Sequence, residues 1–463
     1  MNAYLSLLRQ RPQFRNLWLA SVISFAGDWF NTIASVILVN RYLDSTTAVG
    51  LLFVARALPP FLLGPVAGVI ADRFDRKTVL IATDLSRAGI VLGFLLITSA
   101  EQAWLIYVLT ILQFAISAFF EPARAAILPS LVQGSDEILA ANTLSSITWS
   151  TMLAVGAALG GIVTGLFGVS VAILIDSASF LLSALFIWRI VRIRAAAPTG
   201  SESSGFGDMV DGFRYVRGHP RTALTATVKA FTQIGSPDIM IAVYAAHIFP
   251  YGQDGALSLG LLYTAAGVGA LLGPLLANRL HAGTMRALQN SIAAAFVIVA
   301  LGWLLFGWAP SLPIALVAML IRHMGGSINW TYSSVILQLR VPDRYLGRVF
   351  ALDFALFTLA MSLSVWVSGL LLDHTSLGPR GLTLLLGLGS LAPLLPSVNS
   401  KRSKPQGFIA TQNPWGFLPV NSKRSKPQGF IATQNPWGFL PVNSKRSKPQ
   451  GFIATQNPWG FYR

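Results

Sequence analysis

The sequence alternates long apolar runs with short charged segments, and the segment at residues 72–77 (DRFDRK) shows what this means for the fold. It separates two apolar runs, residues 47–71 and 78–99. Two apolar helices joined by so short a link are antiparallel neighbours. The link therefore lies at one side of a membrane, and its basic residues indicate the cytoplasmic side.

The composition fits helices in a bilayer and excludes an ordinary soluble domain. Only 11% of the 463 residues are charged, against about 25% in soluble chains, and the mean hydropathy is +0.60. A helix of about 20 apolar residues crosses a bilayer, and the alternating pattern of a barrel strand is absent from the sequence. We predict an all-α membrane protein with twelve transmembrane helices, at residues 17–39, 47–71, 78–99, 103–128, 144–166, 168–190, 222–249, 257–280, 287–308, 312–338, 347–372 and 381–398.

The charges between these spans indicate the orientation of the chain. One alternate set of links holds Arg9, Arg11, Arg15, Arg73, Arg76, Lys77, Arg124, Arg192, Arg194, Arg214, Arg217, Arg221, Arg279, Arg286, Arg340, Arg344, Arg348, Lys401, Arg402 and Lys404. The opposite set holds little beyond Arg41 and Arg380. Because basic links stay in the cytoplasm, we expect both termini to be cytoplasmic.

The two halves of the chain repeat one architecture. We predict a six-helix half over residues 1–191, a cytoplasmic linker at 192–220 and a second six-helix half over 221–398. The sequence GPLLANR at 273–279 follows the eighth span as GVIADR at 68–73 follows the second. Repeats of this kind place a cavity between two halves that rock against each other. The pattern therefore indicates alternating access.

The segment after the second span carries a recognisable motif. It combines Gly68, Asp72, Arg73, Arg76 and Lys77, and it resembles the loop motif of the major facilitator superfamily. The resemblance implies that the glycine allows close helix packing and that the aspartate faces the N-terminal dipole of the eleventh helix. It also implies that the basic residues join a cytoplasmic charge cluster, which stabilises one conformer.

Two neighbours complete this motif. The eleventh span is expected to begin near Gly347, which places Asp353 about two turns into the helix. The second glycine of the family motif is replaced by Asp75 here. The other interpretation of the segment is an ordinary basic anchor at the cytoplasmic side.

Two further segments resemble a narrower branch of the superfamily. They are FFEPARAAILP at 119–129 and QLRVPDRYLGRV at 338–349, and both are similar to enterobactin exporters and macrolide-efflux proteins, although Leu346 stands where that branch has arginine. The resemblance covers residues 1 to about 397. It implies a secondary exporter that carries small organic compounds, such as drugs or siderophores, across the bacterial inner membrane in exchange for protons.

The fifth span contains small residues at helical spacing. Gly156, Gly160 and Gly161 match three positions of the superfamily's antiporter motif, whereas Met152 and Ala157 replace its first glycine and its proline. Small residues a turn apart let helices five and eight approach closely. Ordinary helix packing explains this pattern as well as an antiporter motif does.

Ionisable residues within the spans are candidates for the transport machinery, because each costs at least about 2.5–3.5 kcal/mol at membrane depth. Asp28 lies eleven residues into the first span, about 16 Å deep. We expect Asp28, and after it Glu121, to be the proton-coupling carboxylate. The alternative for Asp28 is a structural ion pair with Arg56.

Three further side chains are candidates for lining a substrate cavity. Arg56 and Arg322 lie at similar depth in spans two and ten, and Asp238 lies in span seven. Either arginine suits an anionic group of a substrate. The alternative is that such an arginine holds helices together.

Other functions lack a pattern in the sequence. Without a Gly-Lys dipeptide there is no phosphate-binding loop of the ATPase type, and no His/Cys cluster indicates a metal site. Much of the net charge of +16 comes from residues 399–463, which hold ten Lys and Arg and no acid, so a nucleic-acid partner is not indicated. We expect a monomer with no cofactor and no enzymatic activity, whose partners are a small-molecule substrate, protons and membrane lipid.

The end of the chain is a tandem repeat. Residues 399–420 are repeated identically at 421–442, and a third copy begins at 443. Proline and glycine without a helical or strand period are typical of disorder. We interpret this basic tail as an accidental extension whose deletion leaves transport unchanged; the alternative is a segment that adheres to anionic lipid.

Two other functional hypotheses remain open beside the exporter. One is a folded but transport-inactive relative with a truncated last helix, since Pro393 and Pro396 interrupt the twelfth span before the repeats begin. The other is a membrane scaffold that binds lipid or a partner through the basic tail.

Overall fold

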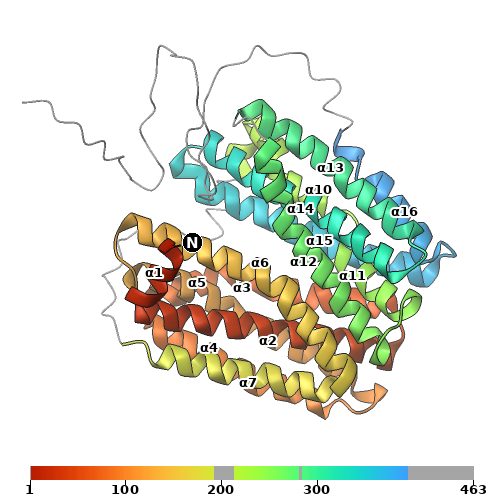
Figure 1. The fold of residues 1–463 in the computed structure, drawn as a ribbon, viewed down its shortest axis with the longest axis horizontal. Coiled ribbons are helices and arrows are strands. Elements are labelled where there is room, and N and C mark those ends of the chain that lie inside the picture. Colours follow the sequence, from red (N-terminus) through yellow and green to blue (C-terminus); the bar gives the residue numbers. More distant parts are fainter. Residues whose placement is uncertain (1, 192–212, 281–283, 395–463) are drawn as a thin grey trace, which may run out of the picture. The chain divides into compact units, whose positions relative to one another are not determined.

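The computed structural model describes residues 2–191, 213–280 and 284–394, and within these ranges all elements are helical (Figure 1). The first part of the chain contains α1 (Asn2–Gln10), α2 (Pro12–Leu43), α3 (Thr46–Arg73), α4 (Arg76–Leu92), η1 (Gly93–Leu96), η2 (Ala100–Gln102), α5 (Trp104–Ile127), η3 (Leu128–Ser130), α6 (Gly134–Phe167) and α7 (Val169–Trp188). The second part contains α9 (Pro220–Ala226), α10 (Val228–Thr232), α11 (Pro237–Val243), η4 (Tyr244–Ile248), η5 (Gln253–Gly255), α12 (Ala256–Leu280), α13 (Met285–Trp308), α14 (Leu312–Arg340), α15 (Asp343–His374) and α16 (Gly378–Gly389).

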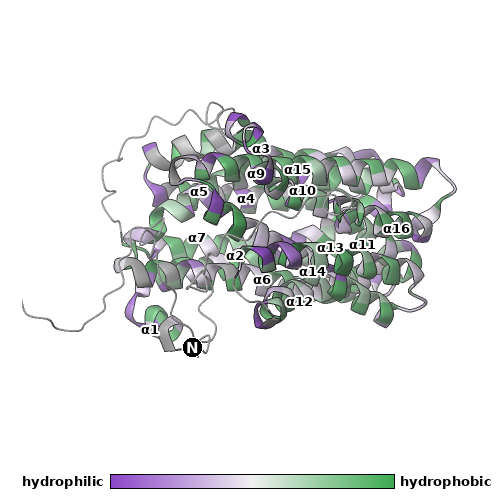
Figure 2. Ribbon diagram, turned by 90° about the horizontal axis from the view of Figure 1, so that it is seen from above, coloured by the Kyte–Doolittle hydropathy of each residue, from purple (hydrophilic) through white to green (hydrophobic). Residues whose placement is uncertain are grey.

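Ten helices in the described ranges are long and apolar enough to cross a membrane. They are the expected spans one to six and eight to eleven, and they confirm the predicted all-α membrane fold. Hydrophobic residues dominate these helices (Figure 2). Large apolar side chains such as Leu58, Trp104 and Leu359 remain exposed, as expected for surfaces that face lipid tails.

The expected seventh span is divided into short helices. Between α10 and α11 the backbone turns at Gly235, which has a φ of 72°, and Pro237 then begins α11. The Oγ of Ser364 on α15 accepts hydrogen bonds from the N–H groups of Gly235 (2.7 Å) and Ser236 (3.1 Å). A broken helix is tolerated at membrane depth when neighbouring side chains satisfy the freed backbone groups in this way.

The expected twelfth span is represented by α16, which has 12 residues and packs on α13. Residues 395–463, with the repeated tail, lie outside the described residues, as does most of the linker at 192–212.

The helices pack as two groups. Helices α2 to α7 contact one another through the pairs α2·α7, α2·α6, α3·α5, α4·α7 and α4·α5, while α9 to α16 form a second set through pairs that include α13·α14, α12·α14, α13·α16, α10·α15 and α15·α16 (Figure 1). We call these groups the first and second halves. The main contacts between them are the pairs α6·α12 and α3·α15.

Small residues allow the halves to meet closely at α6 and α12. A Cβ added to Gly161 would lie 2.6 Å from the Cα of Gly260. The other two glycines of the predicted packing motif face α2 instead: Cβ atoms at Gly156 and Gly160 would meet Trp29 at 2.9 Å and 3.1 Å.

Candidate functional site

Asp28 lies at the middle of α2, one of the two longest helices of the first half. It lies 16 positions after Pro12 and 15 positions before Leu43, the two ends of α2. Its side chain is half-buried, and among the described residues it forms no ion pair with Arg56. A carboxylate at this depth that retains access to solvent is suited to exchange protons with a water-filled cavity.

Arg56 of α3 is held beside Asp28 through Thr32. Its Nη2 donates a hydrogen bond of 2.5 Å to the Thr32 hydroxyl, which itself donates to the Asp28 carbonyl at 2.6 Å. The guanidinium lies 4.6 Å from the centre of the Phe114 ring. The charges of Asp28 and, from the second half, Asp238 are within electrostatic reach of this arginine.

The first half also contains a buried ion pair that our sequence reasoning missed. Arg87 donates to Asp84 one turn earlier on α4, and the Ser183 hydroxyl of α7 donates to the same carboxylate at 2.6 Å. The side chains of Asp84 and Arg87 are 0% and 4% exposed. Arg87 is further enclosed by the rings of Phe120 and Phe180, at 4.6 and 4.2 Å. Two opposite charges three residues apart within the apolar run 78–99 were the available signal.

Asp176 of α7 completes this group of charges. It is 0% exposed, and its charge and that of Asp28 act on each other. Neither of its carboxyl oxygens has a hydrogen-bond partner among the described residues. Asp176 begins the third turn of α7.

The second half presents its own polar group around Asp238. This carboxylate accepts a hydrogen bond of 3.0 Å from the Tyr263 hydroxyl and one of 3.1 Å from the Ser236 hydroxyl. The ring of Tyr263 in turn lies 4.9 Å from the ring of Trp29 on α2. The pair of Trp29 and Tyr263 therefore bridges the two halves. Asp28 precedes Trp29 in the sequence, and Asp238 is hydrogen-bonded to Tyr263.

Arg322 stabilises the break in the seventh span. It is 3% exposed, and its Nη2 donates to the Thr232 carbonyl at the end of α10 over 3.2 Å. Its guanidinium lies 5.2 Å from the Trp303 ring. These contacts cap the end of a helix, and Asp238 is within electrostatic reach of the same charge.

Glu121 lies away from these buried groups. It belongs to the last two turns of α5, where Arg124 Nη2 donates to it over 2.7 Å, and its side chain is 53% exposed. It nevertheless acts electrostatically on Asp28.

The basic residues of the loop motif brace the first half at the end of the helices. Arg76 donates to the Ala126 carbonyl at 3.0 Å, and Lys77 donates to the carbonyls of Trp188 and Ile190 at 2.7 and 2.5 Å. Arg73 is exposed. Gly68 and Asp72 belong to α3, and their side chains lie outside the described residues.

Asp353 is paired within the second half. Lys229 of α10 donates to it, and the side chains are 5% and 1% exposed. The ammonium also lies 4.6 Å from the centre of the Trp330 ring. Helix α15 begins at Asp343, before the start expected near Gly347.

Polar contacts join the two halves at one end of the helices. At that end Arg41 pairs with Asp254 at 2.5 Å, and Asp373 accepts hydrogen bonds from Ser45 and from the Thr47 N–H at 2.8 and 2.9 Å. The Asp373 carboxylate therefore caps the beginning of α3. We call these contacts the end clamp.

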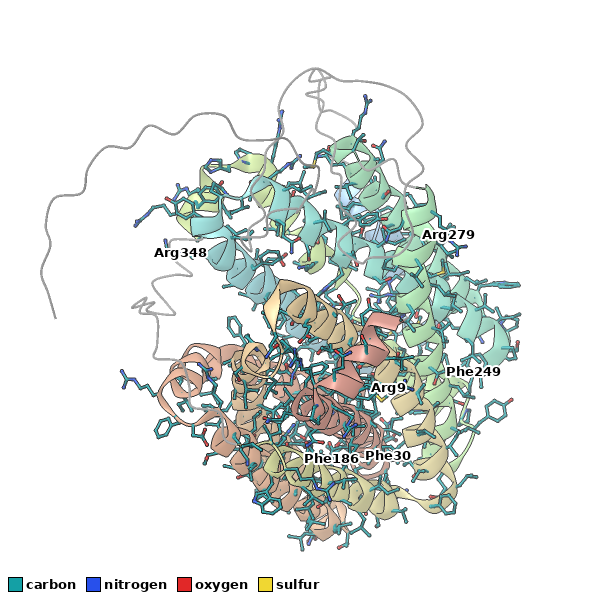
Figure 3. The ribbon with its side chains drawn as sticks, turned by 60° about the vertical axis from the view of Figure 1, so that its left-hand side comes forward. Arg9, Phe30, Phe186, Phe249, Arg279 and Arg348 are labelled. Carbon is teal, nitrogen blue, oxygen red and sulfur yellow. The ribbon has the colours of Figure 1, made fainter. Side chains whose placement is uncertain are left out.

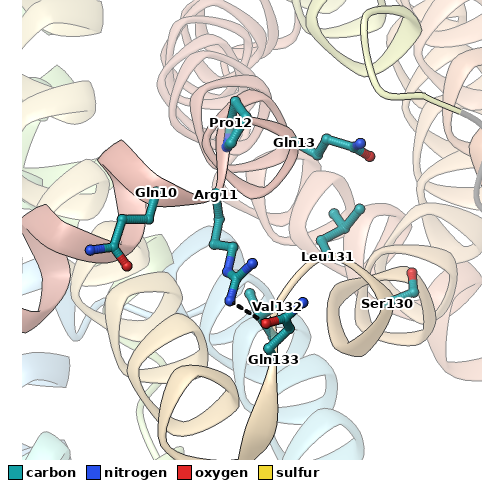
Figure 4. A pocket seen from close by; sticks show the side chains of 8 residues that line it. All are labelled: Gln10, Arg11, Pro12, Gln13, Ser130, Leu131, Val132 and Gln133. Carbon is teal, nitrogen blue, oxygen red and sulfur yellow. Dashed lines mark hydrogen bonds between the residues drawn. The ribbon is translucent and has the colours of Figure 1, made fainter.

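The opposite end carries the basic links. Figure 3, with this end turned forward, labels Arg9, Arg279 and Arg348. A small pocket lies here where α1 meets α2, lined by residues 10–13 and 130–133 (Figure 4). Arg11 donates to Gln133 at 2.7 Å and pairs with Glu137 at 2.8 Å. The hydrogen bond from Arg11 to Glu137, together with one from the Gln133 N–H, lowers the pKa of Glu137.

Two groups of long membrane helices, with ionisable side chains set against the contact between them, define a transporter of the major facilitator type. Residues 3–407 match the family described as transmembrane secretion effector, and the chain belongs to that family.

Known proteins agree with this assignment. YfiS of Bacillus subtilis (strain 168), described as an uncharacterized MFS-type transporter, is 27% identical over 390 residues, 79% of this chain and 89% of YfiS. The enterobactin exporter EntS of Salmonella choleraesuis (strain SC-B67) is 26% identical over 350 residues, 74% of this chain and 82% of EntS. The crystal structure of the nucleoside transporter NupG has the same fold, with a TM-score of 0.65 at 14% identity, over 83% of this chain and 98% of NupG. The chain is thus a multi-pass membrane transporter for small molecules.

Proposed function

We propose that the protein is a secondary exporter that moves small organic compounds out across the bacterial inner membrane in exchange for protons. Export is supported by the family and by EntS, whose name gives the siderophore enterobactin as its cargo. Proton exchange rests on the position of Asp28, a half-buried carboxylate at the middle of α2 that forms no ion pair among the described residues.

The transport cycle that we propose rocks one half, residues 1–191, against the other, residues 221–398. The end clamp is the periplasmic side, because the basic links lie at the opposite end and mark the cytoplasm. Both termini are then cytoplasmic. With the end clamp closed, the substrate enters from the cytoplasm; opening it while the other end closes releases the substrate outward.

Asp28 and Arg56 bind different partners in this cycle. We propose that binding of a proton to Asp28 and binding of a substrate near Arg56 exclude each other. Exchange of protons for substrate requires this kind of competition. Arg56, with one hydrogen bond to Thr32 and its Nη1 unpaired among the described residues, suits an anionic group on the substrate. Asp238 and Tyr263 are the nearest polar groups that the second half contributes.

Efflux from an exporter-deficient bacterium tests this function. Cells expressing the protein are loaded with fluorescent dyes, macrolides or catecholate siderophores, and efflux is followed with and without a protonophore. We expect protonophore-sensitive efflux of at least one compound, lost in Asp28→Asn and retained in Asp44→Asn, which makes the same change at the exposed end of α2. Efflux by Asp28→Asn that remains sensitive to the protonophore would refute the role of Asp28.

A further inference from the structure

Asp176 lies where its carboxyl group is directed at α2, one residue from Asp28. A Cβ added to Gly27 would lie 2.7 Å from the Asp176 Oδ1 and 1.9 Å from the Ser179 Oγ. The missing side chain of Gly27 therefore provides the space that this carboxyl group occupies. The Asp176 carboxyl group of α7 thus lies against the turn of α2 that contains Asp28, and Asp176 is enclosed whereas Asp28 is half-buried.

The surroundings of Asp176 do not suit a negative charge. The residue is 0% exposed, and neither oxygen accepts a hydrogen bond from a described residue. The Ser179 hydroxyl donates to the Asp176 backbone carbonyl instead, at 2.7 Å. Burial without a hydrogen-bond donor at either oxygen favours the neutral acid over the carboxylate.

Charged groups face Asp176 from three of the helices around it. Asp28 on α2 repels a negative charge, whereas Arg87 on α4 and Arg56 on α3 attract it. Arg87 is already bound by Asp84. Its Nε–H, however, has no acceptor among the described residues. Residues 138–167 of α6 contain no charged side chain.

We propose that Asp176 holds a proton in this conformation and exchanges it with Asp28, so that the two carboxyl groups form a proton-holding pair inside the first half. In the exchange an O–H bond on Asp176 breaks and an O–H bond on the Asp28 carboxylate forms. The negative charge moves from Asp28 to Asp176, where the charges of Arg87 and Arg56 attract it. The enclosed Asp176 stores the proton, and the half-buried Asp28 releases it to water.

The role of this pair in transport rests on the proposed function, but the protonation of Asp176 is measurable without any substrate. Infrared spectroscopy of the purified protein in lipid detects the C=O stretch of a protonated carboxyl group in a dry environment. At neutral pH we expect this band in the natural protein and its loss in Asp176→Asn. Asp353→Asn is the matched control, because Asp353 is also buried but is paired with Lys229 in the second half, so the band remains.

Gly27→Ala provides a second test that retains the carboxyl group. The added Cβ displaces Asp176 and Ser179, so we expect the band to shift in frequency. Asp176→Asn is nearly isosteric with the protonated acid, and its circular dichroism and elution volume are expected to match those of the natural protein. Absence of the band at neutral pH, or a band unchanged in a folded Asp176→Asn protein, would overturn the proposal.

Transport distinguishes failure of this inference from failure of the proposed function. For an exported compound, we expect the Asp176→Asn protein still to carry substrate across the membrane down its own concentration gradient. We expect it to lose transport against that gradient, which the proton gradient drives. If no compound is exported but the band behaves as described, the protonation of Asp176 stands and the exporter fails. If protonophore-sensitive efflux is found in the natural protein and in Asp176→Asn alike, the exporter stands and the pair is refuted.

Discussion

Gly161 of α6 and Gly260 of α12 cross so closely that a Cβ on either glycine would lie 2.6 Å from the Cα of the other. This crossing is one of the two main contacts between the halves. It brings together the expected fifth and eighth spans without any apolar side chain between them, as small residues allow in membranes.

We predict that Gly161→Ala separates the two helices and lowers the stability of the protein by about 1–3 kcal/mol, the usual range for overpacking. Gly89→Ala on α4 is the matched control, because nothing lies within 4 Å of its added Cβ. There alanine is expected to be neutral or to stabilise the helix by about 0.5–1 kcal/mol. Thermal unfolding in detergent measures both changes, and equal midpoints for the two variants would contradict the close crossing.

The buried pair of Lys229 and Asp353 leads to a second prediction. Lys229→Met leaves the Asp353 carboxylate buried without its cation, which is expected to cost about 3–5 kcal/mol. The double variant Lys229→Met/Asp353→Leu removes both charges, and we expect it to recover most of that stability. Denaturation in detergent distinguishes these cases. A single variant as stable as the natural protein would show that the pair is dispensable.

The end clamp offers a test of the conformational cycle. The chain contains no cysteine, so a pair introduced by Ser45→Cys and Asp373→Cys has no competing thiol. The two natural side chains are hydrogen-bonded at 2.8 Å, so the two introduced thiols lie on neighbouring side chains that face each other. We expect oxidation to form a disulfide and stop efflux, and reduction to restore it. Each single-cysteine variant, treated with the same oxidant, is the control; undiminished efflux by the cross-linked protein would exclude opening at this end.

The pair of Arg11 and Glu137 predicts a dependence on pH. The pKa of Glu137 is lowered in the folded protein, so its contribution to stability is complete above the ordinary pKa of glutamate and declines as the pH falls through the lowered value. We therefore expect Glu137→Gln to be less stable than the natural protein at neutral pH, with the difference disappearing in acid. The effect is small and decreases with salt, because the pair is partly exposed. A difference in unfolding temperature that grows on acidification would contradict it.

Run length and hydropathy predicted most of the fold. The run at 257–280, for example, became α12 (Ala256–Leu280). They did not predict the division of the seventh span, although Gly235 and Pro237 were visible in the sequence. Those two residues break a helix only because Ser364 and Arg322 satisfy the exposed backbone groups, and contacts between distant segments are not encoded in a local pattern.

Less of the candidate site than of the fold could be predicted from the sequence. Depth alone selected Asp28, and the same rule applied to residues 78–99 would have selected Asp84 and Arg87. The isolation of Asp176 was not predictable, because it depends on which face of α7 meets Gly27. Depth likewise could not show that Arg56 binds Thr32 and forms no ion pair with Asp28 among the described residues.

The most direct test of proton-coupled export uses inverted membrane vesicles that contain the protein. The vesicles are acidified by respiration, and a pH-sensitive dye reports protons leaving the lumen when a compound identified by the efflux assay is added. We predict substrate-induced proton release from vesicles with the natural protein and none from vesicles with Asp28→Asn at equal expression. Transport of the compound without proton release in the natural protein would contradict the exchange of protons for substrate.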